Sequence, residues 1–294
     1  MVIGLAKGKI TPAKLMDMKM KGERIVMVTA YDYPSAKLAD MAGIDVILVG
    51  DSLGIFILGF RDTRRVTIDD IIHHSRPVSR AVERALTVGD MPFATYLNMD
   101  MASINASRII RDGGVDTVKI EGGSEVSSIV RGLVMNGIHV MGHIGYTPQK
   151  MIDVGAYPVQ GLSVDDAMRI INDAVELEKA GVYALILEFV AAEVAKVITG
   201  LLEIPVIGIG SGPYCDGQVL VLHDVIGLRL GDQPPYSRSF GNVGQVMMNA
   251  LEDYARNVRS GSFPSRDNYV SISRDDYNRL VSTVRDKYGY KASR

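Results

Sequence analysis

The chain has 294 residues, of which 47% are hydrophobic and 22% charged, and its formal net charge is -2. A chain of this length and apolar content can bury one large core, and α/β barrels of this size fold as single domains. The balanced charge and the lack of a basic run argue against a nucleic-acid partner.

A single cysteine, Cys215, excludes an intrachain disulfide and a zinc site built from cysteines. It favours a reducing compartment. Lys7 and Lys9 interrupt the first apolar stretch before it reaches the length of a signal peptide. We therefore expect a cytoplasmic protein.

The most apolar window, residues 182–202, contains Glu188, Glu193 and Lys196. Charged side chains are costly inside a bilayer. We therefore predict a strand followed by a helix in this window, and no membrane-spanning segment.

The chain alternates short β-branched runs with helical stretches. A helix is expected first, in residues 11–22. Runs typical of buried strands then follow at 24–32, 45–52, 85–93, 115–123, 138–145, 183–190, 204–212 and 218–227. Strands that are apolar on both faces are typical of a parallel sheet covered by helices. The pattern favours an α/β fold, a (β/α)8 TIM barrel with an extra N-terminal helix, over an open doubly wound sheet.

Amphipathic stretches between the runs predict helices, for example at 35–43 and 164–181, each with a glycine after its last turn. We expect one barrel domain, residues 1–261. Residues 262–294 have helical apolar spacing at Tyr277, Leu280 and Val284 among many charges. We predict a C-terminal helical extension there that packs on the barrel or frays from it.

Charged residues end five consecutive predicted strands: Asp51, Asp90, Glu121, His143 and Glu188. In a barrel, the chemistry collects at the carboxyl ends of the strands. A lone aspartate after a strand is most often a helix cap or a turn residue. Five such residues at equivalent positions instead predict a functional site.

Buried carboxylates repel one another unless a cation or a proton neutralises them. Asp51, Asp90 and Glu121 supply the oxygen ligands that Mg²⁺ prefers, and Mn²⁺ suits the same ligands. Zinc fits less well, because the five histidines show no ligand spacing. We predict a Mg²⁺ site formed by these three carboxylates.

Lys119 lies two residues before Glu121 in a predicted strand. Residues two apart point to the same side of a strand, so both face the barrel mouth if Val118 and Ile120 meet the helices. Lys119 then either anchors an anionic substrate group or forms a structural ion pair. The glycine-rich segment 208–217 is likewise open to two readings, a phosphate cradle or a tight turn.

Together the motifs "TAYDYPSAKLAD", "VGDSLG", "GDMPF", "VKIEGG", "GHIGYTPQ", "LILEFV", "IPVIGIGSG" and "HDVIGL" closely resemble the ketopantoate hydroxymethyltransferase family. The resemblance runs in order from about Ile10 to Gly261 and implies a barrel of the phosphoenolpyruvate/pyruvate type. It also implies Mg²⁺ and a homo-oligomer, a decamer. Phe60 in "GFRDT" and Pro158 in "GAYPVQG" depart from the family pattern.

The resemblance also implies roles for individual residues. Glu188 is the expected catalytic proton acceptor, and the expected metal ligands are those already derived. The residues expected to bind substrate are Asp51, Ser52, Asp90, Lys119 and His143.

The implied reaction transfers a hydroxymethyl group to 3-methyl-2-oxobutanoate and gives 2-dehydropantoate (ketopantoate), through a metal-stabilised enolate. The expected donor is 5,10-methylenetetrahydrofolate, and a related pterin is the alternative. Two other functions stay open. A Mg²⁺-dependent carbon–carbon lyase or mutase could use the same barrel, although the cysteine motif expected of it is absent. The second open function is that of a catalytically inactive barrel that serves as a binding or assembly module.

Overall fold

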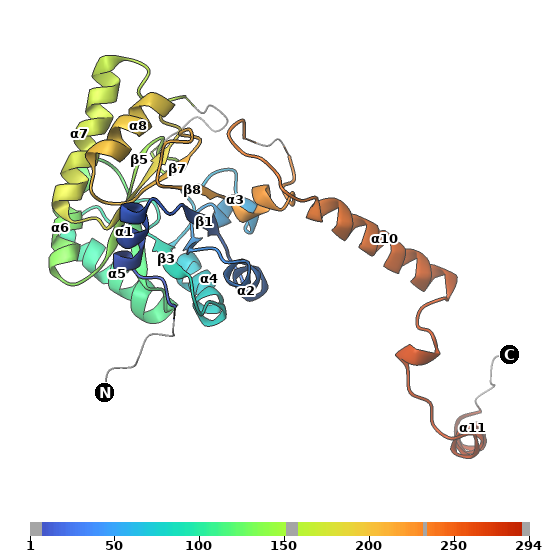
Figure 1. Cartoon of the computed structure of the whole chain (residues 1–294). Helices are drawn as coiled ribbons and strands as arrows, with labels where there is room; N and C mark the ends of the chain where they lie inside the picture. Colours follow the sequence, from blue (N-terminus) through green and yellow to red (C-terminus); the bar gives the residue numbers. More distant parts are fainter. Residues whose placement is uncertain (1–7, 151–157, 232–233, 290–294) are drawn as a thin grey trace. The chain divides into compact units, whose positions relative to one another are not determined.

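The computed structural model describes residues 8–150, 158–231 and 234–289 and contains a closed barrel of parallel strands (Figure 1). The strands follow one another around the barrel in chain order until β8 pairs with β1. Each overlaps one predicted run, so the predicted (β/α)8 barrel is confirmed. The strands are β1 Ile25–Thr29, β2 Val46–Val49, β3 Leu86–Asp90, β4 Thr117–Glu121, β5 Val140–Gly145, β6 Ala184–Glu188, β7 Val206–Ile209 and β8 Gly217–Leu220.

Helices lie between successive strands from β1 to β7, whereas β7 runs on to β8 without a helix. Helix α1 precedes the first strand, as predicted for the extra N-terminal helix (Figure 1). The helices in the first part of the chain are α1 Pro12–Lys21, α2 Tyr33–Met41, α3 Leu53–Phe56, α4 Ile68–Ala81, α5 Met99–Gly113, α6 Ser127–Met135, α7 Val164–Ala180, α8 Ala192–Leu201 and α9 Leu222–Val225, with a 3-10 turn η1 at Ser124–Val126. The later part contains α10 Val243–Ser260, the 3-10 turn η2 Arg266–Asn268 and α11 Arg274–Tyr288.

Short sequence signals set where the helices begin and end. At the start of α4, Thr67 and Asp70 bond reciprocally to each other's backbone N–H groups, which satisfies donors that a helix start leaves free. Ser163 caps α7, and Gly181 follows its last residue with φ 100°. Glycine adopts this left-handed conformation at low cost, so α7 ends at the predicted residue.

The core has two apolar layers, separated by the barrel wall. In β2, Val46 and Leu48 belong to the layer inside the barrel, whereas Ile47 and Val49 belong to the layer under the helices. This alternation follows from the two-residue period of a strand. Leu15 of α1 joins the inner layer. The strands are therefore apolar on both faces, as the sequence predicted.

Strand β4 follows the same alternation where it carries its charges. Val118 and Ile120 lie in the layer under the helices. Thr117 contacts Tyr183, a member of the inner layer, through hydroxyl groups 2.9 Å apart. Lys119 and Glu121 therefore share the inner side of the barrel, which confirms the orientation expected from their spacing.

The chain divides into two compact units, residues 1–241 and 242–294. The division precedes α10, whereas we predicted a boundary after Gly261. In the described part of the second unit, neither α10 nor α11 has a buried residue. Two points stay predictions. One is that α10 belongs to the barrel domain, and the other is that the C-terminal tail packs on the barrel.

No helix in the described residues is both long enough and apolar enough to cross a membrane.

We predict that Leu177→Ala lowers the free energy of unfolding by about 2–5 kcal/mol, because it removes a fully buried side chain and leaves a cavity. Leu177 is buried in α7, and its Cδ1 atom packs over Gly142 of β5. Urea unfolding followed by circular dichroism measures the change.

The matched control is Leu162→Ala, since Leu162 is 77% exposed. It should change the free energy of unfolding by less than about 0.5 kcal/mol. Equal effects of the two substitutions would contradict the assigned core.

Candidate active site

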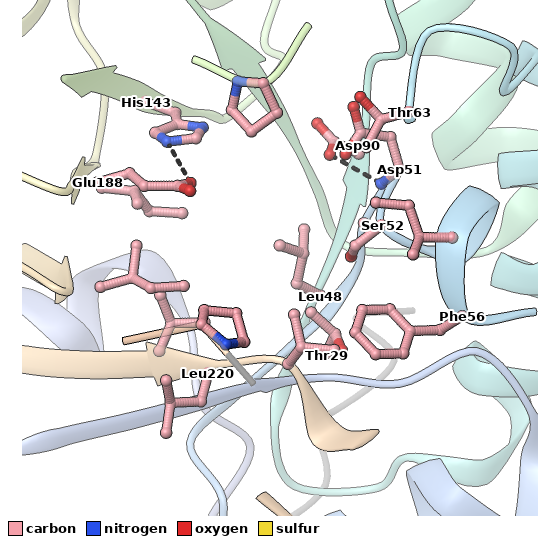
Figure 2. A pocket seen from close by; sticks show the side chains of 18 of the residues that line it. Thr29, Leu48, Asp51, Ser52, Phe56, Thr63, Asp90, His143, Glu188 and Leu220 are labelled. Carbon is pink, nitrogen blue, oxygen red and sulfur yellow. Dashed lines mark hydrogen bonds and ion pairs between the residues drawn. The ribbon is translucent and has the colours of Figure 1, made fainter. Parts of the chain in front are cut away.

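The charged strand ends meet in one cavity of about 160 Å³. That space suits a small organic acid and is below the roughly 300 Å³ of pockets for drug-sized ligands. Figure 2 shows Asp51, Ser52 and Asp90 on one side of the cavity and His143 and Glu188 facing them. Lys119 and Glu121 also line it. The structure thus brings together all seven residues that the sequence nominated.

Lys119 is 4% exposed and lies between two of the carboxylates. Its Nζ atom is 2.7 Å from both carboxylate oxygens of Asp90 and 3.4 Å from Oε1 of Glu121. Burial opposes the ammonium charge, but the surrounding carboxylates outweigh that effect and raise the pKa of Lys119 above its ordinary value. Lys119 is therefore a buried cation that neutralises part of the cluster.

Asp51 is the carboxylate that the cluster leaves least compensated. Its backbone N–H donates to Oδ2 of Asp90 at 3.0 Å, which holds the two aspartates side by side. Burial and the neighbouring charges of Asp90 and Glu121 raise the pKa of Asp51 well above its ordinary value. Among the described residues, no basic side chain forms an ion pair with Asp51. A cation or a proton must therefore supply the missing positive charge.

His143 lies between two carboxylates that come from neighbouring strands. Its Nδ1 atom is 3.3 Å from Oε1 of Glu121, and its Nε2 atom is 3.2 Å from Oε2 of Glu188 (Figure 2). Neither contact has hydrogen-bond geometry, so both buried ring nitrogens lack a hydrogen-bond partner within the described residues.

The charges on these three residues favour one another. Burial opposes the imidazolium, but Glu121 and Glu188 favour it and raise the pKa of His143 to about 9. Burial likewise opposes the carboxylate of Glu121, but Lys119 and His143 hold its pKa at about 2. At neutral pH, His143 is therefore a second cation inside the cluster.

The backbone around Glu188 is closely fixed. Its carbonyl oxygen accepts a hydrogen bond from the N–H of Tyr146 at 2.7 Å. A Cβ atom on Gly145 would lie only 2.3 Å from that oxygen, and Gly145 has φ 93°. Phe189, the next residue after Glu188, has φ 53°, a left-handed conformation that is unfavourable for a bulky side chain. The chain holds Glu188 in place despite this local strain.

Two polar residues that the sequence reasoning did not nominate complete the cluster. Gln149 is 1% exposed and donates from Nε2 to Oδ2 of Asp51 at 3.0 Å. The hydroxyl of Tyr96 lies 2.7 Å from Oε1 of Gln149. Gln149 falls inside the motif "GHIGYTPQ", but a loop glutamine after a strand gives no sign by itself of which strand end it reaches.

Ser52 lies beside the cavity next to Asp51 and has a fixed partner. Its Oγ atom is 2.8 Å from the hydroxyl of Tyr31, which is 1% exposed. One hydroxyl of this pair donates to the other, so the hydroxyl that accepts keeps its own proton to donate toward a bound molecule. The pair therefore gives the cavity an uncharged polar edge opposite His143 (Figure 2).

The glycine-rich segment adopts a tight turn, as one of its two readings predicted. Gly210 and Gly212 have φ 62° and 79°. Between them, Ser211 is fully buried, and its hydroxyl donates to the carbonyl of Leu187 at 2.7 Å. The turn therefore joins the ends of β6 and β7, while the phosphate cradle stays a prediction.

The carboxylate oxygens of the cavity are ligands that suit a hard cation, although they are not arranged around one common position. No group of three or more histidine, cysteine, aspartate or glutamate side chains in the described residues is arranged to hold a metal ion. The ammonium of Lys119 forms hydrogen bonds with both carboxylate oxygens of Asp90 and contacts Glu121. The residues nevertheless fit Mg²⁺ chemically, because Asp51 and Asp90 are adjacent buried oxygen donors and the charge of Asp51 is uncompensated. Glu121 fits less well, since Lys119 and His143 already neutralise it.

Known proteins similar to this chain agree on one family. The family model for ketopantoate hydroxymethyltransferase matches residues 9–266. A 3-methyl-2-oxobutanoate hydroxymethyltransferase from Moorella thermoacetica is 49% identical over 262 residues, which cover 89% of this chain and 97% of the relative. The enzyme of that name from Pyrococcus furiosus is 46% identical over 281 residues, 95% of this chain and 98% of the relative.

Solved structures support the fold. A phosphonopyruvate hydrolase in complex with oxalate and Mg²⁺ has a TM-score of 0.55 at 11% identity and covers 96% of this chain and 100% of that one. A 2,3-dimethylmalate lyase, described as a member of the PEP mutase/isocitrate lyase superfamily, has a TM-score of 0.55 at 15% identity, with 93% and 98% covered. At such identities the likeness concerns the barrel alone. The family model and the curated relatives show that the chain belongs to the ketopantoate hydroxymethyltransferase family.

Proposed function

We propose that this protein transfers a hydroxymethyl group from 5,10-methylenetetrahydrofolate to 3-methyl-2-oxobutanoate and so forms 2-dehydropantoate, the precursor used in pantothenate and coenzyme A biosynthesis. The observation that carries the proposal is the cavity in which Asp51, Asp90, Lys119, His143 and Glu188 meet. Membership of an enzyme family supports the same reaction. The lyase or mutase alternative has only the low-identity likeness of folds in its favour.

Asp51 and Asp90 are the proposed Mg²⁺ ligands, with Glu121 as a third, weaker contributor. Their buried negative charge and oxygen atoms are the properties that attract a hard cation. A bound Mg²⁺ supplies electron withdrawal from the oxo group of the substrate and so favours the enolate. Mn²⁺ has the same ligand preference and stays an alternative.

Lys119 is proposed to bind the carboxylate of the oxo acid. In the structure its ammonium is bonded to Asp90 and close to Glu121. A cation on Asp90 would compete for the oxygens that now hold Lys119. The ammonium could then pair with a substrate anion without leaving the cavity. A lysine ammonium is a compact point charge with three rotatable donors, which suits such an exchange of partners.

Glu188 is proposed to remove the proton from C3 of the oxo acid. It lies across the cavity from Asp51 and Asp90 (Figure 2), so a substrate between them has one side toward the cation ligands and the other toward this carboxylate. A general base must lie within hydrogen-bond reach of the proton that it takes. Nε2 of His143 lies 3.2 Å from Oε2 of Glu188, and Ser52 supplies a polar contact on the opposite wall.

The proposed one-carbon carrier rests on the resemblance of the sequence motifs to the family and not on the cavity. Tetrahydrofolate and related pterins present a similar methylene group, so the folate is our proposal and another pterin is the alternative. We also infer a cytoplasmic location, which is supported by the single cysteine, Cys215, a free and buried thiol.

We predict that Glu188→Gln abolishes exchange of the C3 proton of 3-methyl-2-oxobutanoate with deuterated water and the formation of ketopantoate. The amide keeps the size of the side chain but has no basic oxygen that can take a proton. Proton NMR follows the exchange in the presence of Mg²⁺, without a one-carbon donor. Removing a general base should lower the rate by about 100-fold or more.

The control for that experiment is Glu193→Gln, the same substitution at an exposed residue of α8. It should leave the exchange rate unchanged. If Glu188→Gln exchanges the C3 proton at the rate of the wild-type protein, Glu188 is not the general base. If the wild-type protein forms no ketopantoate from the oxo acid, Mg²⁺ and a methylene donor, the proposed reaction itself is wrong.

We predict that substitution of Asp90 impairs the binding of Mg²⁺, whereas substitution of Lys119 impairs the binding of the oxo acid. Asp90→Asn should weaken Mg²⁺ binding by at least about ten-fold, because it removes a charged ligand. Lys119→Ala should retain Mg²⁺ binding, since Nζ no longer competes for Asp90, but should raise the KM for the oxo acid by about ten-fold or more, as expected for a lost charged hydrogen bond.

Isothermal calorimetry with Mg²⁺ and steady-state kinetics separate these two effects. Thermal unfolding by circular dichroism shows whether each variant still folds. Unchanged Mg²⁺ affinity in Asp90→Asn would count against the metal site. An unchanged KM in Lys119→Ala would favour the purely structural ion pair.

We propose that the protein is a homo-oligomer, with the decamer as the expected size. An apolar stripe on α10, formed by Val246, Leu251, Tyr254 and Val258, supports this. These side chains are between 46% and 67% exposed within one chain. An apolar face of this kind is typical of a protein–protein contact, and a second copy of the chain is the occupant that we propose.

We predict that Leu251→Asp shifts the protein toward smaller assemblies in sedimentation velocity, because a carboxylate in an apolar interface loses its hydration. Asn249→Asp adds the same charge to the polar side of α10 and should keep the wild-type assembly. A wild-type monomer, or equal assemblies of all three proteins, would contradict the proposed interface.

A further inference from the structure

Gln149 forms hydrogen bonds with residues from three different strand ends of the cluster. It lies in the loop that follows β5 and is 1% exposed. Its Nε2 atom is 3.0 Å from Oδ2 of Asp51 and 3.1 Å from the carbonyl oxygen of Met91. Its backbone N–H donates to Oε2 of Glu121 at 3.2 Å. One residue therefore links the ends of β2, β3 and β4.

The chemistry of the neighbours fixes which way the amide points. Nε2 faces two oxygen acceptors, and its two N–H bonds can satisfy both. Oε1 faces the hydroxyl of Tyr96 at 2.7 Å. The reverse orientation would place Oε1 against a carboxylate and a carbonyl, which repel it. Every polar atom of the Gln149 side chain is thus used, and Tyr96 holds the amide in this orientation.

Tyr96 is itself anchored to the strand that carries Glu121. Its hydroxyl also lies 3.0 Å from the carbonyl oxygen of Glu121, so its one proton is shared between that oxygen and the nearer Oε1 of Gln149, and its side chain is buried. Asp51 is held through Oδ2 alone, because no described hydrogen bond uses its Oδ1. The arrangement fixes one oxygen of Asp51 and leaves the other free to bind a cation.

We propose that Gln149, held by Tyr96, is a positioning residue that orients the carboxylates of Asp51 and Glu121 for cation binding. The inference rests on the proposed function, since it assigns Gln149 to the same metal site. Residues that hydrogen-bond to metal ligands fix the direction of the ligand atoms, and their loss weakens metal binding. An apolar side chain of similar size would fill the same space without giving the carboxylates a direction.

The first test is Gln149→Leu, with binding of Mg²⁺ alone measured by isothermal calorimetry in the absence of oxo acid and folate. Mg²⁺ affinity should fall by about ten-fold or more. Gln218→Leu is the matched control, because Gln218 is an exposed residue of β8 whose side-chain amide donates to the carbonyl of Gly212. Its Mg²⁺ affinity should equal that of the wild type.

The second variant, Tyr96→Phe, removes only the hydroxyl and keeps the buried ring. It should weaken Mg²⁺ binding by about 3-fold to 10-fold, as expected for one lost hydrogen bond. Thermal unfolding separates a binding defect from a folding defect. If Gln149→Leu does not fold, Tyr96→Phe decides the question, and unchanged Mg²⁺ affinity in that variant overturns the inference.

The outcomes also separate this inference from the proposed function. A wild-type protein that binds Mg²⁺ together with a folded Gln149→Leu variant of equal affinity would overturn the role of Gln149 and leave the metal site standing. A wild-type protein that binds no Mg²⁺ or Mn²⁺, with or without oxo acid, would contradict the metal site and this inference together.

Discussion

The buried ammonium of Lys119, bonded to Asp90 and close to Glu121, is the interaction on which the site depends. Carboxylates transferred out of water are unstable unless positive charge and hydrogen bonds replace the lost hydration. Six carboxyl groups line the cavity, those of Asp51, Asp62, Asp90, Glu121, Glu188 and Asp224, against four basic side chains, those of Arg61, Lys119, His143 and Arg229. The negative excess favours the entry of a cation.

The closed barrel is what makes such a concentration of charge possible. Parallel strands bring their carboxyl ends to one rim, and the two-residue period sends Lys119 and Glu121 inward while Val118 and Ile120 pack under the helices. The wall itself is apolar on both faces, so its stability does not rest on the charged rim. Phe189, the residue after Glu188, has an unfavourable left-handed backbone conformation next to the proposed base.

The part of the chain after Gly241 has a different character. Its two helices have caps and apolar stripes but no buried residue among those described. An amphipathic helix gains most of its stability by packing its apolar side against something else. The proposed assembly of several copies would bury the stripe on α10 in this way. For α11 no partner surface is assigned.

The sequence by itself determined the strands, the helix that precedes them, the closed α/β architecture and the residues at the strand ends, because these features depend on local periodicity and on the rule that strand ends share one rim. It also nominated Asp51, Asp90, Glu121, His143 and Glu188 for one site. Only the tertiary structure decided how these groups contact one another. Lys119 bonds to Asp90 more closely than to Glu121, its neighbour in sequence, and Gln149 reaches Asp51 across 98 positions of the chain. A helical stripe such as that of α10 shows that a face must be buried but not what covers it. Distances between loops and charges depend on how separate strands pack, and no local pattern records that packing.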